Sequence, residues 1–263
     1  MEQGAPDVQT GPSKGERLLQ AAPEPKVLAQ LPDWFRHQEY VSFDASRYDL
    51  RQCVTQLLDR ADEARLGSFP DDAKSLETYA ADEAVFRSFH VRQRLRQCVS
   101  QDVELLGVYE QLVKEVLCPH LKAKIVERTG SAEPVCFSFQ YPPTVRLQPG
   151  PSKQFKRPHR DAEYGHQVGE LNFWMPLTNY TEMTRTTLWV ESAPNLADFR
   201  PLDIDYGMIA MFHGTLCNHR VPANASKFTR VSMDFRIGIG DFYDKEWALQ
   251  GLKGEHGRRE FWL

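Results

Sequence analysis

Residues 158–178 read PHRDAEYGHQVGELNFWMPLT, and this stretch decides the fold. Its second half alternates between two kinds of side chain. One set is Leu171, Phe173, Met175 and Leu177, and the other is Glu170, Asn172 and Trp174. Successive residues of a strand point to opposite faces of a sheet, so strict alternation is typical of a strand whose two faces have different surroundings. The stretch therefore predicts a β-strand that follows closely on a loop carrying His159 and Asp161.

The same alternation returns in two other long runs, at 135–141 and 230–239, and shorter apolar runs at 188–191 and 208–212 also indicate strands. Pro, Gly and Asn residues interrupt the chain between these runs, as turns require. Several short strands of this kind predict a sandwich or barrel, and a double-sheet jelly roll fits the length of 134–243. We expect an α+β protein in which helices support this β core.

The segment 45–130, by contrast, has a helical period. Its apolar residues recur at intervals of three and four, which places them on one face of a helix. The clearest set is Leu105, Val108, Leu112 and Val116, and a second set is Leu76, Tyr79, Val85, Phe86 and Phe89. Gly130 and Pro134 mark the end of the helical region. We expect these N-terminal helices to pack against the β core, and we assign them no chemistry.

The two ends of the chain differ from the part between them. Residues 1–32 hold five Pro, three Gly and few large apolar side chains. Such a segment buries too little surface to offset the entropy of ordering it, so we expect a flexible tail. We expect 33–263 to form one domain. The aromatic residues of its C-terminal tail, 244–263, either pack on the helices or form a contact in a homo-oligomer.

Composition narrows the class of protein. The chain has 263 residues, with 32 basic and 36 acidic side chains and a formal net charge of −4. This balance argues against a nucleic-acid partner, because binding a phosphate backbone requires a basic surface. The longest apolar run, Met208–Phe212, is far shorter than the roughly 20 residues that span a bilayer, and residues 1–30 lack the apolar segment of a secretory signal. Five cysteines without CxxC spacing predict reduced thiols and a cytoplasmic setting.

Three histidine and aspartate residues near the predicted strands are candidates for metal ligands. His159 and Asp161 are separated by one residue, so an extended backbone points both the same way. His219, 58 residues beyond His159, can supply a third ligand from a neighbouring strand end. Two imidazoles and one carboxylate leave other positions of a metal ion open, which suits Fe(II) enzymes that bind oxygen. HxD spacing is common by chance, so the hypothesis depends on the combination.

A candidate anion site follows on the last long strand. Arg230 and Ser232 lie on one face of the run 230–239. A guanidinium and a hydroxyl that point together form a good cradle for a carboxylate. Arg236 is on the same face but about 20 Å further along an extended strand, so both arginines are not expected to hold one carboxylate. We prefer Arg230, because it lies closer to His219 in the sequence and has the hydroxyl beside it.

The order of these groups resembles a known family. The runs concerned are PHRDAEYGHQVGELNFWMPLT, LWVES at 188–192 and CNHRVPANASKFTRVSMDFRIG at 217–238. Together they resemble the Fe(II)- and 2-oxoglutarate-dependent oxygenases, and most closely a StrG-like subgroup from streptomycin biosynthesis that is related to the phytanoyl-CoA dioxygenases. The resemblance spans 134–243. One departure is the RTT sequence at 185–187, where a turn with Asn and Gly is expected, and we expect it to affect the substrate pocket rather than the metal centre.

The resemblance implies a double-stranded β-helix with an iron ion in its mouth. His159, Asp161 and His219 would hold Fe(II), and 2-oxoglutarate would chelate the iron through its keto acid end. The implied reaction consumes O2, releases succinate and CO2, and usually hydroxylates the substrate. The substrate class that the resemblance suggests is a small polar metabolite, sugar-like or amino-acid-like.

The resemblance also implies a site for the cosubstrate. Arg230, helped by Ser232, would bind the far carboxylate of 2-oxoglutarate. Asn172 and Trp174 are candidates for the wall around the cosubstrate or substrate, with core packing as the alternative for Trp174. Lesser candidates for polar contacts with a substrate are Arg146, Glu163, Tyr164, His166 and Glu191.

Three other functions stay open at this point. A cupin-like metalloenzyme could share the barrel without using 2-oxoglutarate, and it would have no need of Arg230. A non-catalytic jelly-roll binding protein would bind iron poorly and release no succinate. A nucleophile pair of Cys217 and His219 is a weaker alternative, because adjacency in sequence does not show that two side chains meet.

Overall fold

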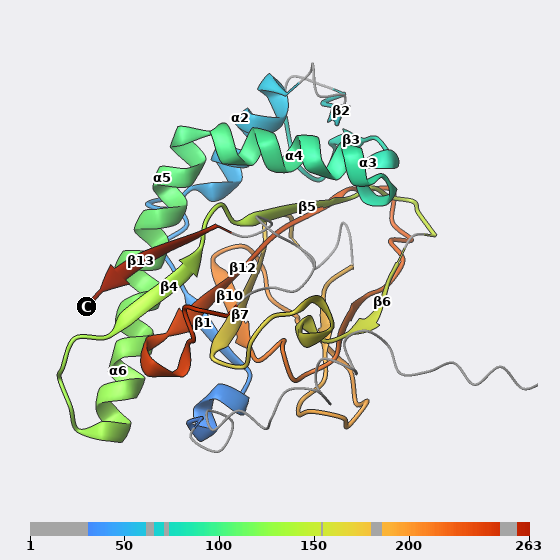
Figure 1. The fold of residues 1–263 in the computed structure, drawn as a ribbon. Coiled ribbons are helices and arrows are strands. Elements are labelled where there is room, and N and C mark those ends of the chain that lie inside the picture. Colours follow the sequence, from blue (N-terminus) through green and yellow to red (C-terminus); the bar gives the residue numbers. More distant parts are fainter. Residues whose placement is uncertain (1–30, 62–65, 71–73, 154, 180–185, 248–256) are drawn as a thin grey trace, which may run out of the picture.

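The β core of the described residues consists of two antiparallel sheets, one of seven strands and one of four, and the strands predicted from alternation all belong to the larger sheet. The computed structural model describes residues 31–61, 66–70, 74–153, 155–179, 186–247 and 257–263. Figure 1 shows the strands of the larger sheet crossing the middle of the molecule, with helices along one side and over the top. The predicted double-stranded β-helix of an α+β protein is confirmed.

The larger sheet contains the long alternating strands. Its order is β1 (Glu39–Ser42), β10 (Met208–Phe212), β7 (Glu170–Pro176), β12 (Arg230–Ile239), β4 (Cys136–Gln140) and β13 (Arg258–Trp262), while β5 (Thr144–Gln148) pairs with the first half of β12. The predictions for β10 and β12 are correct at both ends. Three strands of this sheet, β1, β5 and β13, were not predicted. β1 and β13 show no regular apolar face, and β5 has only two alternating apolar residues, Val145 and Leu147.

The smaller sheet has the order β6 (Lys156–His159), β11 (His219–Val221), β8 (Trp189–Val190) and β9 (Arg200–Pro201). Apolar side chains from both sheets meet in one buried cluster, which lies between them. Its members are Trp174, Leu188, Val190, Leu202, Ile204, Ala210, Phe212, Cys217 and Val221. The two sheets therefore enclose a common interior, as in a jelly roll.

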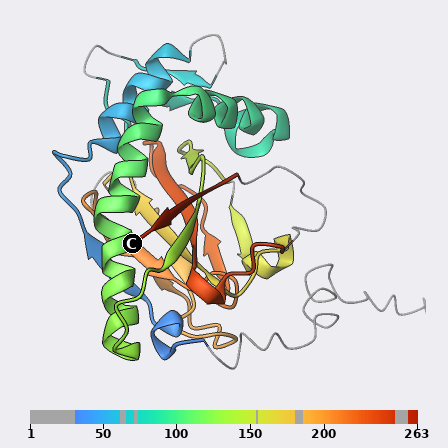
Figure 2. The ribbon, with the colours of Figure 1, turned by 60° about the vertical axis from the view of Figure 1, so that its left-hand side comes forward.

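The helices cover the other face of the larger sheet (Figure 2). They are α2 (Leu50–Arg60), α3 (Ala84–Arg87), α4 (Phe89–Gln101), α5 (Val103–Leu112), the π-helical segment η3 (Val113–Leu117) and α6 (Cys118–Thr129). Tyr109 of α5 packs edge-on against Phe235 of β12, with ring centroids 4.9 Å apart. The expected role of these helices as support for the β core is therefore correct.

One part of the predicted helical region is not helical. The described residues from 66 to 81 form turns and a short hairpin of β2 (Gly67–Ser68) and β3 (Ala80–Ala81). Leu76 and Tyr79 are buried there all the same. For these two residues the periodic pattern predicted burial correctly but not backbone conformation, because a turn can also direct side chains into a core. Phe89 of the same set is 55% exposed, so the prediction was wrong there.

Both ends of the described part of the chain pack against the core. Residues 1–30 lie outside the described residues, and Leu31 is already buried in the core. At the other end β13 pairs with β4 at the edge of the larger sheet, and its Phe261 packs against the core. In the described part of the chain, no helix combines the length and apolar character needed to cross a bilayer.

Candidate active site

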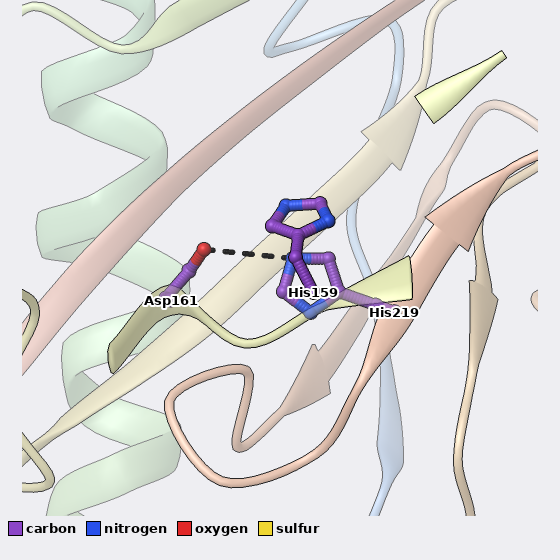
Figure 3. A group of neighbouring side chains, drawn as sticks. All are labelled: His159, Asp161 and His219. Atoms are coloured by element: carbon purple, nitrogen blue, oxygen red, sulfur yellow. Dashed lines mark ion pairs between the residues drawn. The ribbon is translucent and has the colours of Figure 1, made fainter. Parts of the chain in front are cut away.

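His159, Asp161 and His219 come together where the smaller sheet meets the larger one. His159 ends β6 and His219 begins β11, and the two lie opposite each other in register. Asp161 opens a short 3-10 helix, Asp161–Tyr164, two residues beyond His159. One ligand atom from each side chain lies within 4.8 Å of the other two (Figure 3). Folding therefore gathers the three side chains that the sequence analysis selected.

Both imidazoles turn the same ring nitrogen towards the protein. Nδ1 of His159 lies 2.9 Å from the carbonyl oxygen of Arg157, and Nδ1 of His219 lies 3.2 Å from that of Cys217. A carbonyl can only accept, so each Nδ1 carries a proton, and Nε2 is the ring nitrogen left to face a metal ion. This arrangement, in which a backbone carbonyl fixes the tautomer, is how metal-binding histidines are usually oriented.

The site is buried, and this determines its protonation. Burial, with a smaller effect from His219, lowers the pKa of His159 to about 4. His159 is therefore neutral at physiological pH and able to donate its lone pair. The ring of Tyr164 packs edge-on against it, with centroids 5.4 Å apart.

The two carboxylate oxygens of Asp161 have different surroundings. Oδ2 accepts hydrogen bonds from Nδ2 of Asn172 at 2.6 Å and from Nε and Nη2 of Arg236 at 2.9 and 2.7 Å. Oδ1 lies 3.5 Å from Nε2 of His219. Burial alone would raise the pKa of Asp161, but Arg236 and His219 hold it well below its usual range. The carboxylate is thus ionised, with one oxygen directed at the histidines.

Arg230 is a buried cation that forms no ion pair with a carboxylate of the described residues. Only 3% of its surface is exposed, and its Nη2 donates to Oγ of Ser232 at 2.9 Å. Its Nε and Nη1 are buried and make no hydrogen bond. Burial, reinforced by Arg146, lowers the pKa of Arg230 to about 10, so it stays charged at neutral pH. Buried donors of this kind are costly unless a ligand satisfies them, and a carboxylate would do so.

Asn172 and Trp174 neighbour each other on one face of β7 but have different contacts. Asn172 holds Asp161 directly and lies opposite Arg236 of β12 in register. Trp174 belongs to the apolar cluster between the sheets, opposite Ala210 of β10. Contact of either residue with a cosubstrate or substrate stays a prediction.

The lesser candidates mostly have structural partners. Arg146 forms a double hydrogen bond with Asp234. Glu191 accepts from the backbone and side-chain nitrogens of Asn218 at 2.6 and 3.0 Å. Since Asn218 precedes His219, the Glu191 carboxylate helps to fix the loop that presents this histidine. In the RTT sequence, Thr187 donates to the carbonyl of Leu202, while residue 185 lies outside the described residues.

A cysteine nucleophile does not fit this site. Cys217 is buried, and burial followed by the charge of Glu191 raises the pKa of its thiol to about 11. A reactive cysteine needs a thiolate. His219 meets the carbonyl oxygen of Cys217 through Nδ1. We therefore set aside the Cys217–His219 pair.

Sequence reasoning missed Arg236, which it considered only as a rival to Arg230. It also missed a second buried ion pair, in which Glu170 binds His166 and Arg258. Burial opposes ionisation of Glu170, but Arg258 and His166 lower its pKa to about 2. The available signal was the position of Glu170 and Arg236 on the polar faces of strands whose apolar faces enter the core. A charged residue there must find a partner between the sheets.

Gly214 supports Asp161 through close packing. Its carbonyl accepts the Asp161 backbone N–H at 2.9 Å, and a Cβ added at Gly214 would lie 2.6 Å from the amide group of Asn172. We expect Gly214→Ala to displace Asn172 from Asp161 and to lower the free energy of unfolding by about 1–3 kcal/mol. Urea denaturation measures this loss. The control is Gly107→Ala, since that Cβ meets nothing within 4 Å, and equal stability of the two variants would contradict the prediction.

His213 is expected to make the free energy of unfolding depend on pH. Burial lowers its pKa to about 4, and its Nε2 donates to the carbonyl of Val168 at 2.9 Å. Below pH about 6.5 the unfolded chain takes up a proton that the folded chain does not. The stabilisation is thus complete above pH 6.5 and is lost as pH falls towards 4, to an extent on the order of 2–3 kcal/mol.

The variant His213→Gln keeps an N–H donor for Val168 but cannot titrate in this range. We expect its free energy of unfolding, measured by urea denaturation, to fall less steeply than that of the wild type between pH 6.5 and 4. If the free energies of unfolding of the two proteins fall equally steeply with pH, His213 does not contribute to the pH dependence of stability.

Comparison with known proteins gives one related sequence and several structures. No protein-family model matches the chain. The streptomycin biosynthesis protein StrG of Streptomyces griseus is 31% identical over 158 residues, which cover 59% of this chain and 67% of that protein.

Solved structures are similar at lower identity. The nogalamycin-biosynthesis carbocyclase SnoK, described as non-heme and α-ketoglutarate dependent, is 13% identical over 86% of each chain with a TM-score of 0.47. A prolyl-4-hydroxylase of Pseudomonas putida is 15% identical over 81% of this chain and 99% of its own, with a TM-score of 0.41. At these scores the superpositions do not transfer the role of any residue.

Proposed function

Since the chain belongs to the family of the streptomycin biosynthesis protein StrG, we propose that it is an Fe(II)- and 2-oxoglutarate-dependent oxygenase that oxidises a small polar metabolite. The family membership confirms the resemblance drawn from the sequence. The observation that carries the proposed activity is the combination of two buried features. One is the His159, Asp161 and His219 group, and the other is the guanidinium of Arg230, two of whose nitrogens have no hydrogen-bond partner among the described residues.

The residues fit both groups that this activity requires. Two imidazoles and one carboxylate are the donor set of non-haem Fe(II) oxygenases, and three ligands leave positions for a cosubstrate and oxygen. A structural zinc site would have a fourth protein ligand, and none joins the group in the part of the chain that the structure describes. The free donors of Arg230 suit a dicarboxylate better than a neutral cosubstrate.

Each residue has a definite task in this proposal. His159 and His219 offer Nε2, and Asp161 offers Oδ1, to the metal. Arg230, with the hydroxyl of Ser232 beside it, receives the far carboxylate of 2-oxoglutarate and orients it. When bound, iron would bring together O2, which is the oxidant, and 2-oxoglutarate, which gives up two electrons as it loses CO2. 2-Oxoglutarate, O2 and the substrate would then become succinate, CO2 and an oxidised product. The two sheets limit the access of water.

The substrate is proposed to be sugar-like or amino-acid-like, and hydroxylation is the proposed outcome. Membership of the StrG family supports a small polar natural product. We place the reaction in the cytoplasm, which five unpaired cysteines support.

The proposal is tested by adding Fe(II) and then 2-oxoglutarate to the full chain without oxygen. We expect a weak visible charge-transfer band that needs both additions, and no band with His159→Ala. A metabolite screen for substrate-stimulated succinate then identifies the reaction. Metal binding without any response to 2-oxoglutarate would instead favour a cupin-like metalloenzyme.

A further inference from the structure

Arg236 lies beside the candidate metal centre, and all three of its guanidinium nitrogens are held. Nε and Nη2 donate to Oδ2 of Asp161, and Nη1 donates to Oε1 of Gln140 at 3.1 Å. The Gln140 amide in turn donates to Oγ1 of Thr144 at 3.0 Å and to the carbonyl of Pro142 at 3.2 Å. Only 6% of Arg236 is exposed. The guanidinium therefore has one orientation, set by the strands on which these residues lie.

This orientation of the guanidinium gives the two carboxylate oxygens of Asp161 different roles. Oδ2 accepts three N–H groups, two from Arg236 and one from Asn172. An oxygen that accepts three hydrogen bonds has no lone pair left for a metal ion. Oδ1 accepts no hydrogen bond from the described residues. It is the oxygen on the histidine side, and Nε2 of His219 lies 3.5 Å from it.

We propose that Arg236 is a positioning residue that makes Asp161 a ligand through Oδ1 alone, so that the carboxylate occupies one coordination position and not two. The inference rests on the proposed function, because it assumes a metal ion at this site. A second oxygen would fill a position that a chelating cosubstrate or oxygen needs. A planar guanidinium suits the task better than an ammonium group, because its paired N–H donors prevent the carboxylate from rotating.

The test uses Co(II) as the probe, because its visible absorption reports the number and kind of ligands. The full chain is titrated with Co(II), with 2-oxoglutarate absent, and the spectrum and dissociation constant are recorded for the wild type and for Arg236→Lys. Lysine keeps the positive charge but lacks the paired N–H donors of the guanidinium. We expect Co(II) binding to weaken by about 10- to 100-fold and the absorption bands to change in position and intensity. Wild-type affinity and spectrum in Arg236→Lys would overturn the inference.

The matched control is Arg258→Lys, which changes a partly buried arginine that binds a buried carboxylate, that of Glu170, in the same sheet. We expect this variant to lose stability but to keep the wild-type Co(II) spectrum and affinity. An equal spectral change in both variants would overturn the inference, since it would reflect a general loss of packing. If Arg236→Lys does not fold, the same Co(II) titration is made with Asn172→Ala, which removes the third hydrogen-bond donor to Oδ2 of Asp161. It should shift the spectrum in the same direction by less, and no shift would overturn the inference.

Failure of the inference and failure of the proposed function give different results. If the wild type binds Co(II) and His159→Ala does not, the metal site stands, and the Arg236 variants test positioning alone. If His159→Ala binds Co(II) as tightly as the wild type does, the proposed metal site is wrong, and the proposed role of Arg236 is wrong as well.

Discussion

Replacing Asp161 with alanine is expected to abolish metal binding and also to destabilise the metal-free protein by about 3–5 kcal/mol. The first effect follows from the loss of one of three ligands. The second follows because Arg236 would stay buried with two N–H donors that have lost their acceptor. Breaking a buried ion pair from one side leaves an uncompensated charge, which costs more than the pair itself contributes. Urea denaturation with a chelator present measures the second effect alone.

The double variant Asp161→Ala with Arg236→Met separates charge from packing. It removes both members of the ion pair, so we expect it to regain most of the stability that Asp161→Ala loses, while metal binding stays absent. If the double variant is less stable than Asp161→Ala, the loss comes from the cavity and not from the stranded cation. His159→Ala serves as a second comparison, because it removes a ligand without stranding a charge.

Replacing Arg230 with methionine is expected to have opposite effects on stability and on cosubstrate binding. Without a ligand, the buried guanidinium has two unsatisfied nitrogens, so an apolar side chain of similar length should stabilise the protein by about 1–4 kcal/mol. Binding of 2-oxoglutarate to the Fe(II)-loaded protein should weaken by about 2–5 kcal/mol, or roughly 30- to 4,000-fold, because its far carboxylate loses a charged partner.

Anaerobic titration of the charge-transfer band measures this affinity, and urea denaturation of the metal-free protein measures the stability. Arg230→Lys is the informative control, since it keeps the charge but not the fork, and we expect it to bind 2-oxoglutarate with intermediate affinity. Ser232→Ala removes only the hydroxyl that orients the guanidinium and should have the smallest effect. Full affinity for 2-oxoglutarate in Arg230→Met would show that another group holds the far carboxylate.

Much of the site could be predicted because its signals are local. Alternation located β4, β7 and β12, a short apolar run located β10, and the ligand candidates lie at the ends of strands or just beyond them. The strand assignment also placed Arg230 and Ser232 on one face, where the structure joins them by a hydrogen bond. The less regular strands escaped prediction. Among them is β6, which ends in His159 but shows no apolar alternation.

The amino-acid sequence by itself determined which side chains are available for chemistry, and on which face of each strand they lie, since alternation is a property of neighbouring residues. Only the tertiary structure decided which of them meet. Arg236 lies 75 residues from Asp161 yet holds it, whereas Arg230 on the same strand forms no ion pair with any carboxylate that the structure describes. The physical reason is strand register, because the pairing of β12 with β7 sets Arg236 beside Asn172. A buried charge is then stable only when it is paired within the protein or with a bound ligand.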